Sequence, residues 1–307
     1  MSKIGHSNIS IMEKRFESLT IFDFQEQFPD DKSCMNYLSN VKWSGGFICP
    51  QCSNTKYCKG HKEHIRQCTK CNYLASPTSG TLFHKVKFPL LKAFYIVYYI
   101  STNKKGISST ELSRKLGLRQ KTCWLFKQKV MQAMKSSGNN KIKGKAEVDE
   151  TVVGGQEEGV VGRKNGKKKL VVFAIEKTGR GVSRLYGKVI KHSSAKELGD
   201  FMKANIEPDA IVKTDEWTGY KPLKKDFSNL SQIPSGKKGG NFPDLHRVIM
   251  GFKGWLRGMH HHADHLQAYI NEYTYRFNRN FMKANIFDNL LNRMMIAKPC
   301  PYKMIIC

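Results

Sequence analysis

The sequence predicts an α/β protein whose core follows a small cysteine-rich unit and a helical region. Two pairs of cysteines, each with Cys-x2-Cys spacing, lie between residues 47 and 76. Apolar residues then recur at helical spacing as far as residue 137, and strand-like runs begin after residue 138. Three strands, a helix, a fourth strand and further helices follow one another there. That order is typical of an α/β layer with mixed strand pairing.

The charge balance indicates an anionic partner. The 307 residues include 52 Lys and Arg against 25 Asp and Glu, which gives a formal net charge of +27 and a pI of about 9.7. An excess of this size points to a polyanion, most simply nucleic acid. The competing interpretation is a ribosome-associated protein or one that lies on a membrane surface.

Targeting signals are not evident in the sequence. The first ten residues are polar, and no apolar segment typical of a secretory signal follows them. The most apolar run, residues 88–100, has 13 residues and an internal lysine, whereas a membrane-spanning helix needs about 20. We therefore expect a soluble, cytoplasmic protein without a membrane partner. In a reducing compartment its nine cysteines indicate metal binding or packing, not disulfides.

The cysteine pairs predict a structural zinc site. Fifteen residues separate the first pair from the second, which is the spacing of two zinc knuckles that share one tetrahedral ion. The predicted ligands are Cys49, Cys52, Cys68 and Cys71. Free core cysteines are the competing interpretation, and Cys58, His61 and His64 in the intervening loop could substitute for one of the ligands.

Helices on both sides of this unit are expected from periodicity. Two apolar groups, 21–28 and 34–38, predict two short helices with a break at Pro29. After residue 77 we expect three helices, and a short turn containing Gly117 separates the second from the third. This is the outline of a helix-turn-helix, with Arg119, Gln120 and Lys121 at the start of the recognition helix. A helical hairpin that only packs is the alternative.

Two strand-like runs carry acids at informative positions. Asp149 lies in the middle of the run 145–155, and Asp215 ends the run 210–215. A buried carboxylate is costly unless a cation or a donor meets it. Two aspartates on neighbouring strands could therefore hold a divalent metal over a phosphodiester. For each aspartate alone, capping of a turn is the competing interpretation.

Two further segments flank these strands. A basic turn before the strand 170–175 is placed to grip a DNA backbone, through Arg163, Lys164, Lys167, Lys168 and Lys169. Residues 228–244 are rich in Gly, Ser and Lys and predict a loop, after which helix resumes near His246.

The order and wording of several motifs resemble the insertion-sequence transposases of the Merlin (ISXO-like) group, over nearly the whole chain. The matching motifs are Cys49-Pro50-Gln51-Cys52, Thr78-Ser79-Gly80-Thr81, Glu147-Val148-Asp149-Glu150-Thr151, Thr214-Asp215-Glu216-Trp217, His246-Arg247-Val248-Ile249 and Arg276-Phe277-Asn278-Arg279.

The resemblance implies an RNase-H-like core and the following domain order. A helical lead-in (1–46) precedes a zinc ribbon (47–76), a helix-turn-helix DNA-binding region (77–137), an RNase-H-like transposase domain (138–290) and a C-terminal tail (291–307). It also implies strand cleavage and strand transfer at terminal inverted repeats with Mg²⁺ or Mn²⁺. The partners would be transposon ends, target DNA and further copies of the chain, in a bacterial, nucleoid-associated setting.

One position departs from the family pattern. Where the family has Asn or Glu as a third ligand, 36 residues after Asp215, this chain has Gly251. His246 or a water molecule is expected to stand in there, with Lys253 binding the scissile phosphate. The alternatives are a catalytically inactive transposase-derived DNA-binding protein and a stand-alone metal-dependent nuclease.

Overall fold

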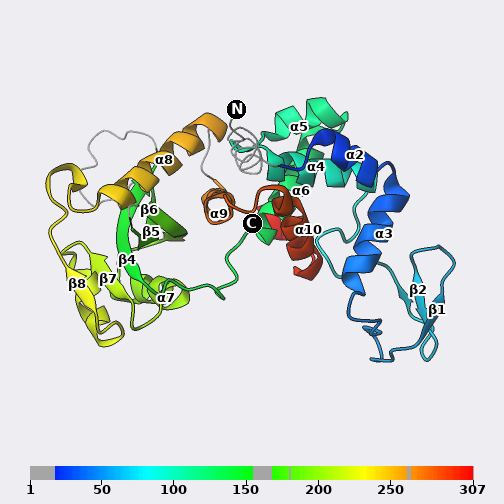
Figure 1. Cartoon of the computed structure of the whole chain (residues 1–307), viewed down its shortest axis with the longest axis horizontal. Coiled ribbons are helices and arrows are strands. Elements are labelled where there is room, and N and C mark those ends of the chain that lie inside the picture. The colour runs from blue at the N-terminus through cyan, green and yellow to red at the C-terminus, as the bar shows by residue number, and fades with distance from the viewer. Residues whose placement is uncertain (1–17, 155–167, 180, 261–263, 307) are drawn as a thin grey trace, which may run out of the picture. The chain divides into compact units, whose positions relative to one another are not determined.

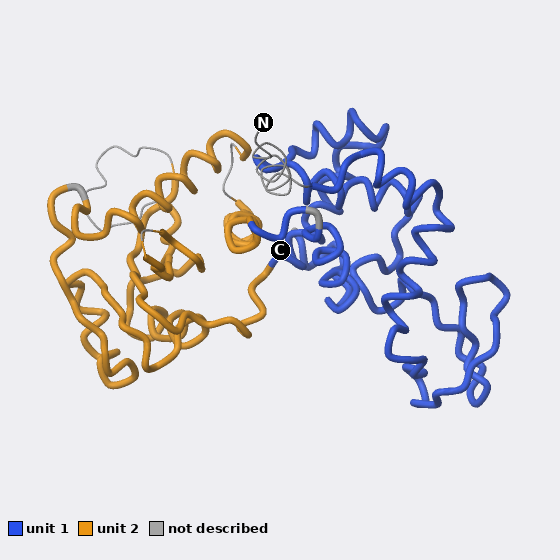
Figure 2. The backbone as a smooth tube through the Cα atoms, in the orientation of Figure 1, with its two compact units in different colours: residues 1–134, 281–307 blue, residues 135–280 orange. Residues whose placement is uncertain are grey.

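A computed structural model describes residues 18–154, 168–179, 181–260 and 264–306. The chain forms two compact units (Figure 2). The first combines residues 1–134 with residues 281–307, and the second is the continuous stretch 135–280. No helix among the described residues is both long and apolar enough to cross a membrane.

The first unit is mainly helical, with an aromatic core. Phe24, Phe28 and Phe94 pack on Phe287, with ring centroids 5.6, 5.8 and 6.3 Å from the Phe287 ring. Helices from both ends of the chain thus share one core (Figure 1). The α-helices of this unit are α2 (Ile21–Gln27), α3 (Asp31–Lys42), α4 (Leu90–Thr102), α5 (Ser109–Leu116), α6 (Gln120–Ala133), α10 (Ile286–Ile296) and α11 (Lys303–Ile306).

Local sequence signals set the ends of α5 and the start of α6. The Ser108 hydroxyl accepts a hydrogen bond from the Glu111 backbone N–H at 3.0 Å and so caps the start of α5. Gly117 ends α5 in the left-handed conformation, at φ 59°, where glycine carries no steric cost. Arg119 is then the N-cap of α6, so a three-residue turn joins the two helices.

A small antiparallel sheet follows α3. Its strands, in the order β1-β2-β3, are β1 (Tyr57–Lys59), β2 (Arg66–Cys68) and β3 (Leu74–Ala75). Trp43 and Phe47 are buried beside Cys49, Cys68 and Ala75 in a core of its own. The guanidinium of Arg66 lies 4.2 Å from the centres of the Trp43 and Tyr57 rings, which closes one side of that core.

The second unit is built on a five-stranded sheet with mixed pairing. The strand order is β6-β5-β4-β7-β8, in which β4, β5 and β6 are antiparallel neighbours and β7 and β8 run parallel to β4. The strands are β4 (Lys145–Val153), β5 (Lys169–Thr178), β6 (Gly181–Ile190), β7 (Ile211–Thr214) and β8 (Leu230–Gln232). The α-helices are α7 (Ala195–Asn205), α8 (Pro243–Met259) and α9 (Leu266–Phe277), and short 3-10 helices include η1 (Thr218–Lys225) and η2 (Lys237–Gly239).

Different elements cover the two faces of this sheet (Figure 1). Alternate residues of β4 and β5, such as Val148 and Val172, are buried in one cluster with Phe201 of α7 and Tyr220 of η1. On the other face Phe173 of β5 packs against Phe252 of α8, with ring centroids 5.3 Å apart. Successive side chains of β4 therefore enter different environments, since the side-chain period of a strand is two.

The outer strand β6 is protected by two side-chain amides of the α9 segment. The Val189 N–H donates to Gln267 Oε1 at 2.8 Å, and the Leu185 N–H donates to Asn278 Oδ1 at 2.7 Å. The Asn278 amide in turn donates to the Leu185 carbonyl at 2.9 Å. An exposed strand edge otherwise offers unpaired backbone groups to other chains, so these amides satisfy it within the unit.

The structure differs from expectation in two respects. The segment 228–244, expected to be a loop, contributes the edge strand β8, whose three residues are too short to give a periodic signal. The expected boundary at residue 290 also differs from the observed division. Residues from 281 onward belong to the first unit, where α10 joins the aromatic core, and residues 291–296 are helical.

Candidate functional sites: a thiol cluster and a carboxylate cluster

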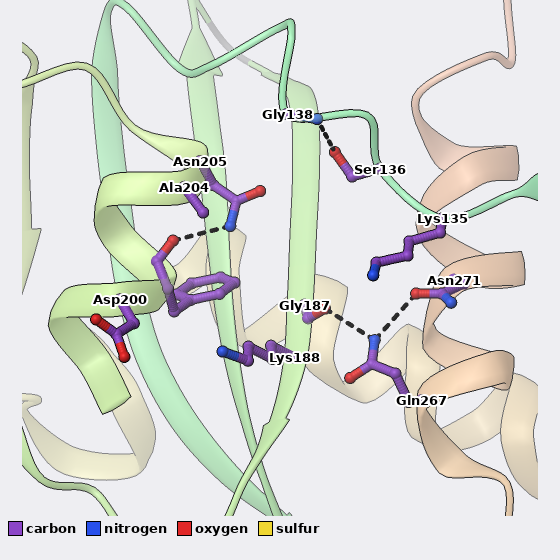
Figure 3. A pocket seen from close by; sticks show the side chains of 11 residues that line it. Lys135, Ser136, Gly138, Gly187, Lys188, Asp200, Ala204, Asn205, Gln267 and Asn271 are labelled. Carbon is purple, nitrogen blue, oxygen red and sulfur yellow. Dashed lines mark hydrogen bonds between the residues drawn. The ribbon is translucent and has the colours of Figure 1, made fainter. Parts of the chain in front are cut away.

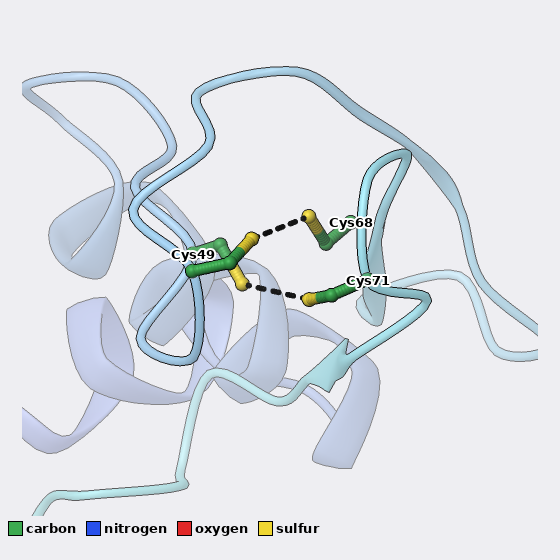
Figure 4. Close-up of side chains that lie close together, drawn as sticks. Cys49, Cys68 and Cys71 are labelled. Carbon is green, nitrogen blue, oxygen red and sulfur yellow. Dashed lines mark hydrogen bonds between the residues drawn. The ribbon is translucent and has the colours of Figure 1, made fainter.

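The four predicted cysteines of the first unit converge. The Sγ atoms of Cys49, Cys52, Cys68 and Cys71 all lie within 4.8 Å of one another. The Cys49–Cys71 and Cys52–Cys68 Sγ separations are both 3.5 Å (Figure 4). A disulfide would need about 2.05 Å, whereas thiolates around one tetrahedral zinc ion stand well apart. Cys58, His61 and His64 lie outside this four-residue group.

The two halves of the thiol cluster repeat the same backbone geometry. The Ser53 N–H donates to the Cys49 carbonyl at 2.9 Å, and the Asn72 N–H donates to the Cys68 carbonyl at 3.0 Å. Ser53 and Asn72 both have a φ of 58°, a left-handed conformation that turns the chain immediately after the second cysteine of each pair. Each Cys-x2-Cys segment is therefore a tight knuckle that presents two sulfur atoms on one side.

Hydrogen bonds favour the ionised form of one thiol. Burial opposes ionisation of Cys68, but donors from the Cys71 backbone, the Asn54 amide and the Lys70 backbone outweigh burial and lower the pKa of Cys68 to about 6. The Asn54 Nδ2 and Lys70 N atoms both lie 3.4 Å from its sulfur. Because the thiolate is the form that binds metal, these donors prepare the site for a cation.

Three acids of the second unit converge at the point where β7 leaves the sheet. One carboxylate oxygen each from Asp149, Glu150 and Asp215 lies within 4.8 Å of the other two. Val148 and Thr214 are the last residues that β4 and β7 pair with each other, so beyond this point β4 is paired only with β5. Asp149, Glu150 and Asp215 are all partly buried. This is an arrangement of hard oxygen donors suited to Mg²⁺ or Mn²⁺.

The turn after β7 fixes Asp215. Its Oδ1 accepts a hydrogen bond from the Trp217 N–H at 3.1 Å, which closes a tight turn. The Gln232 amide of β8 donates to the Asp215 and Trp217 carbonyls at 3.2 and 2.9 Å. The Trp217 indole donates to the Ser193 carbonyl at 2.7 Å. The carboxylate is thus directed by the backbone and by two neighbouring segments.

His246 of α8 stands beside Asp149. Its Nε2 lies 3.5 Å from Asp149 Oδ2, while Asp149 Oδ1 accepts from the Glu150 N–H at 2.7 Å. Gly239 passes against the imidazole so closely that a Cβ atom there would overlap the His246 ring. Gly239 also has a φ of 74°, so glycine is required for two reasons and the loop holds the ring in place.

A charged network connects the start of α8 to the two central strands. Lys177 Nζ of β5 lies 3.1 Å from Glu147 Oε1 and 2.9 Å from Asp244 Oδ2. The Glu147 side chain is only 5 % exposed, so Lys177 supplies the positive charge that its burial requires. The hydrogen bond that Lys177 donates to Asp244 lowers the pKa of Asp244, and its hydrogen bonds to Asp244 and Glu147 raise the pKa of Lys177. Since His246 follows Asp244 by two residues, this network helps to place the imidazole.

Gly251 does not face the acids. It follows His246 by five positions, a rotation of about 140° around the helix. A Cβ atom at Gly251 would lie 3.0 Å from the Tyr273 hydroxyl of α9. Lys253, two turns after His246, is on the same side of α8 as the imidazole. It is half-buried, and burial lowers the pKa of Lys253.

The residues expected to contact DNA are found in different settings. Arg119, Gln120 and Lys121 are exposed at the start of α6. The Gln120 amide donates to the Ser109 hydroxyl at 2.7 Å, and Lys121 Nζ lies 5.7 Å from the centre of the Tyr302 ring. Lys169 donates to the Asp264 carbonyl at 3.0 Å, and Lys168 lies beside Gly154. Arg163, Lys164 and Lys167 fall outside the described residues.

A cavity of about 350 Å³ elsewhere in the second unit is separate from the acids. Figure 3 shows hydrogen bonds between several of its polar groups. The Gln267 amide donates to Asn271 at 3.0 Å, and the Asn205 amide donates to the Phe201 carbonyl at 2.8 Å. None of the three converging acids lines it.

Two residues at the carboxylate site, Glu150 of the cluster and Tyr220 beside it, were not singled out as site residues from the sequence. Glu150 follows Asp149, and strand alternation predicts that adjacent side chains point to opposite faces. The signal that could have found it is the early end of β7, which leaves the edge of β4 open at Glu150. Tyr220 is fully buried, and its hydroxyl has no hydrogen-bond partner among the described residues. Burial and the nearby Glu150, Asp149 and Asp215 carboxylates raise the pKa of Tyr220 well above its usual value, so the hydroxyl stays protonated.

The protein is modular and has two candidate metal sites. One is a ribbon with four thiols, whose sulfur donors suit zinc, and the other is a carboxylate cluster on an α/β sheet, whose oxygen donors suit Mg²⁺ or Mn²⁺. Residues 141–278 match the family described as ISXO2-like transposase domain, and residues 29–74 match the transposase zinc-ribbon domain. The chain therefore contains an ISXO2-like transposase domain and a transposase zinc ribbon, which confirms the resemblance seen in the sequence.

Two individual proteins are similar to the chain. An uncharacterised protein in transposable element ISH50 of Halobacterium salinarum is 24 % identical over 217 residues, which cover 65 % of this chain and 72 % of that protein. The crystal structure of a pre-cleavage Mos1 transpososome matches 62 % of this chain and 74 % of the compared chain, at 9 % identity. Its TM-score of 0.27 is too low to support an argument about the fold.

Proposed function

We propose that this protein is a DNA transposase that binds terminal inverted repeats and catalyses metal-dependent strand cleavage and strand transfer. The observation that carries the proposal is the convergence of Asp149 and Asp215, from neighbouring strands, in a chain with an ISXO2-like transposase domain. The strand order β6-β5-β4-β7-β8, with three antiparallel strands followed by two parallel ones, supports the assignment of an RNase-H-like core.

The donor sets fit the two expected metals. Four thiols with 3.5 Å sulfur separations suit structural zinc, and converging carboxylates suit Mg²⁺ or Mn²⁺. A divalent ion bound at Asp149 and Asp215 would lower the pKa of a bound water or hydroxyl group and offset the negative charge that develops on phosphate.

The chain's own residues would orient and screen the scissile phosphate. His246, held against Asp149 by Gly239, is placed to accept or donate a proton at Nε2. Lys253 lies on the same side of α8 and would bind a phosphate oxygen. Since Gly251 is directed towards Tyr273, we do not assign a catalytic role to that position.

The first unit supports a role in DNA recognition. Helices α5 and α6, joined by a three-residue turn, have the outline of a helix-turn-helix, and Arg119, Gln120 and Lys121 are exposed where base edges would be read. The net charge of +27 would supply the backbone attraction, to which Lys168 and Lys169 would contribute. Pairing of two transposon ends would require at least two copies of the chain.

Cleavage and joining of terminal-repeat DNA would test the proposal directly. Asp149→Asn and Asp215→Asn should each reduce both activities by about a thousandfold or more, because the substitution removes the charge that holds the ion. Asp209→Asn is the matched control, since this exposed aspartate precedes the opposite end of β7. Full activity of either Asp149→Asn or Asp215→Asn would reject the assignment.

Gly251 favours a second candidate, a transposase-derived DNA-binding protein without catalysis, because it lacks the family's third ligand. Such a protein would bind repeat DNA tightly and yet show no nicking when Mg²⁺ or Mn²⁺ is added. A stand-alone nuclease would instead cleave without joining ends. One assay that follows binding, nicking and joining on the same DNA separates the three.

A further inference from the structure

The end of β7 creates an opening along β4 in which side chains from both faces of the sheet can meet. Thr214 is the last residue of β7 that pairs with β4, opposite Val148. Asp149 points towards α8, where His246 is its neighbour. Glu150, the next residue, lies towards η1, where Tyr220 is buried. Asp215 follows Thr214 directly, and one of its carboxylate oxygens lies within 4.8 Å of ligand atoms of both Asp149 and Glu150.

We propose that Glu150 is the third carboxylate ligand of the divalent cation, in place of the side chain that Gly251 lacks. This rests on the proposed function, in which Asp149 and Asp215 hold the same ion. One oxygen of Glu150 lies within 4.8 Å of ligand atoms of both aspartates, and one ion can bridge such a group. Three carboxylates this close repel one another strongly unless a cation lies between them.

The backbone directs the two aspartates of this cluster. Asp149 Oδ1 accepts from the Glu150 N–H at 2.7 Å, and Asp215 Oδ1 accepts from the Trp217 N–H at 3.1 Å. Metal-binding carboxylates are commonly held in this way by hydrogen bonds outside the ligand set. Each aspartate is therefore fixed in a defined direction, in which it would hold an ion.

Tyr220 provides independent support. Its hydroxyl is fully buried, has no hydrogen bond of good geometry among the described residues, and lies beside the Glu150, Asp149 and Asp215 carboxylates, of which Glu150 is the acceptor within reach. A buried hydroxyl without a partner carries a free-energy cost, which is consistent with a site that is completed by a ligand. We assign Tyr220 as a positioning residue whose hydroxyl orients the Glu150 carboxylate towards the ion.

Position 251 is poorly placed to supply the ligand. A side chain there would begin 3.0 Å from the Tyr273 hydroxyl, on a different side of α8 from His246. A ligand from β4 needs no change in α8. The family's third ligand is thus replaced by a residue on the strand, next to Asp149 itself.

Mn²⁺ binding to the full-length, zinc-loaded protein tests the proposal without DNA or turnover. Titration followed by the paramagnetic resonance of free Mn²⁺ should show about tenfold weaker binding for Glu150→Gln, because the ligand loses its charge. Glu216→Gln is the matched control, since this exposed acid follows Asp215 directly. Its affinity should equal that of the unchanged protein.

Two further variants separate Glu150 from its alternatives. Gly251→Asn should leave Mn²⁺ affinity unchanged, whereas a gain in affinity would place the missing ligand on α8 and overturn the proposal. Tyr220→Phe should weaken binding severalfold, and a purely structural hydroxyl would lower the melting temperature and leave affinity unchanged. If Glu150→Gln does not fold, Glu150→Asp, which keeps the charge and withdraws the carboxylate, should show the same loss.

Mn²⁺ affinity distinguishes a failure of the Glu150 proposal from a failure of the proposed transposase function. Unchanged Mn²⁺ affinity in Glu150→Gln, together with loss in Asp149→Asn and Asp215→Asn, overturns the role of Glu150 and leaves the proposed transposase intact. Unchanged affinity in all three variants would remove the cation site altogether, and the proposed catalytic function with it.

Discussion

The thiol cluster and the carboxylate cluster bring metal-binding groups together in opposite ways. The four cysteines come from two copies of one local turn, and the backbone around Ser53 and Asn72 is the same in both. The three acids come from the middle of β4 and the end of β7, which are more than 60 residues apart in the chain. The first site is organised locally, and the second exists only when the sheet forms.

This difference between the two clusters indicates which of the two metal ions would be needed for folding. A three-stranded sheet with a core of a few residues cannot stabilise itself, so its folding should depend on zinc. The carboxylate cluster stands on a five-stranded sheet covered on both faces, and its ion would be exchangeable without unfolding. The two sites should therefore respond differently to the same treatments.

Loss of the zinc site should have the largest effect on stability, and it should separate the thiol cluster from the carboxylate cluster most clearly. Structural zinc contributes about 10–16 kcal/mol of binding free energy in small zinc domains, so Cys71→Ser should unfold the ribbon. Hydrogen exchange should show loss of protection in β1–β3 and unchanged protection in β4 and β5. Cys58→Ser is the matched control, because Cys58 is exposed and lies outside the cluster. Equal zinc loss in both variants would contradict the four-thiol assignment.

Loss of Lys177 should destabilise the carboxylate unit alone. Lys177→Met leaves the buried Glu147 without its positive partner, at a cost of roughly 3 kcal/mol in the free energy of unfolding of that unit. Hydrogen exchange in β4 and α8 measures this cost. Lys203→Met removes a comparable but exposed pair with Asp226 and should cost below about 1 kcal/mol. Similar losses in the two variants would show that the Lys177 network is not special.

A methyl group at Gly239 tests whether the loop at this residue fixes the position of the His246 ring. Gly239→Ala should cost roughly 1–3 kcal/mol and displace the imidazole from Asp149, which is measured by the NMR signals of the ring. Gly236→Ala is the control, because Gly236 has the same φ of 74° but a new Cβ atom would only approach Asn241 at 3.3 Å. If both variants leave the imidazole signals unchanged, the close approach does not orient the ring.

A fall in pH should weaken the attachment of α8 to the sheet, and this effect should be the smallest of the four. The pKa of Asp244 is lowered in the folded protein, so the unfolded chain binds the proton first as the pH falls. Stability from this group is present above its unfolded pKa and is lost as the pH falls through the folded pKa. Hydrogen exchange of α8 amides should therefore accelerate towards acid, and Asp244→Asn should flatten this dependence. An unchanged slope in that variant would show that other groups control it.

The sequence alone determined the features that depend on neighbouring residues. The spacing of Cys49, Cys52, Cys68 and Cys71 predicted a knuckle pair because ligand geometry there is local. Apolar periodicity predicted α2, α3 and the three helices α4 to α6, and β-branched runs predicted β4, β5 and β7. Short ordered motifs, such as Cys49-Pro50-Gln51-Cys52 and Thr214-Asp215-Glu216-Trp217, carried the family resemblance that the domain matches confirm.

Only the tertiary structure decided the features that depend on where a strand stops and what packs over it. Alternation along β4 predicts opposite directions for Asp149 and Glu150, and they meet only because β7 ends one residue earlier. The burial of Tyr220 beside them, and the return of α10 to the aromatic core of the first unit, arise from contacts between distant segments. Such contacts leave no periodic signal in the sequence, because burial is shared among residues that are neighbours only after folding.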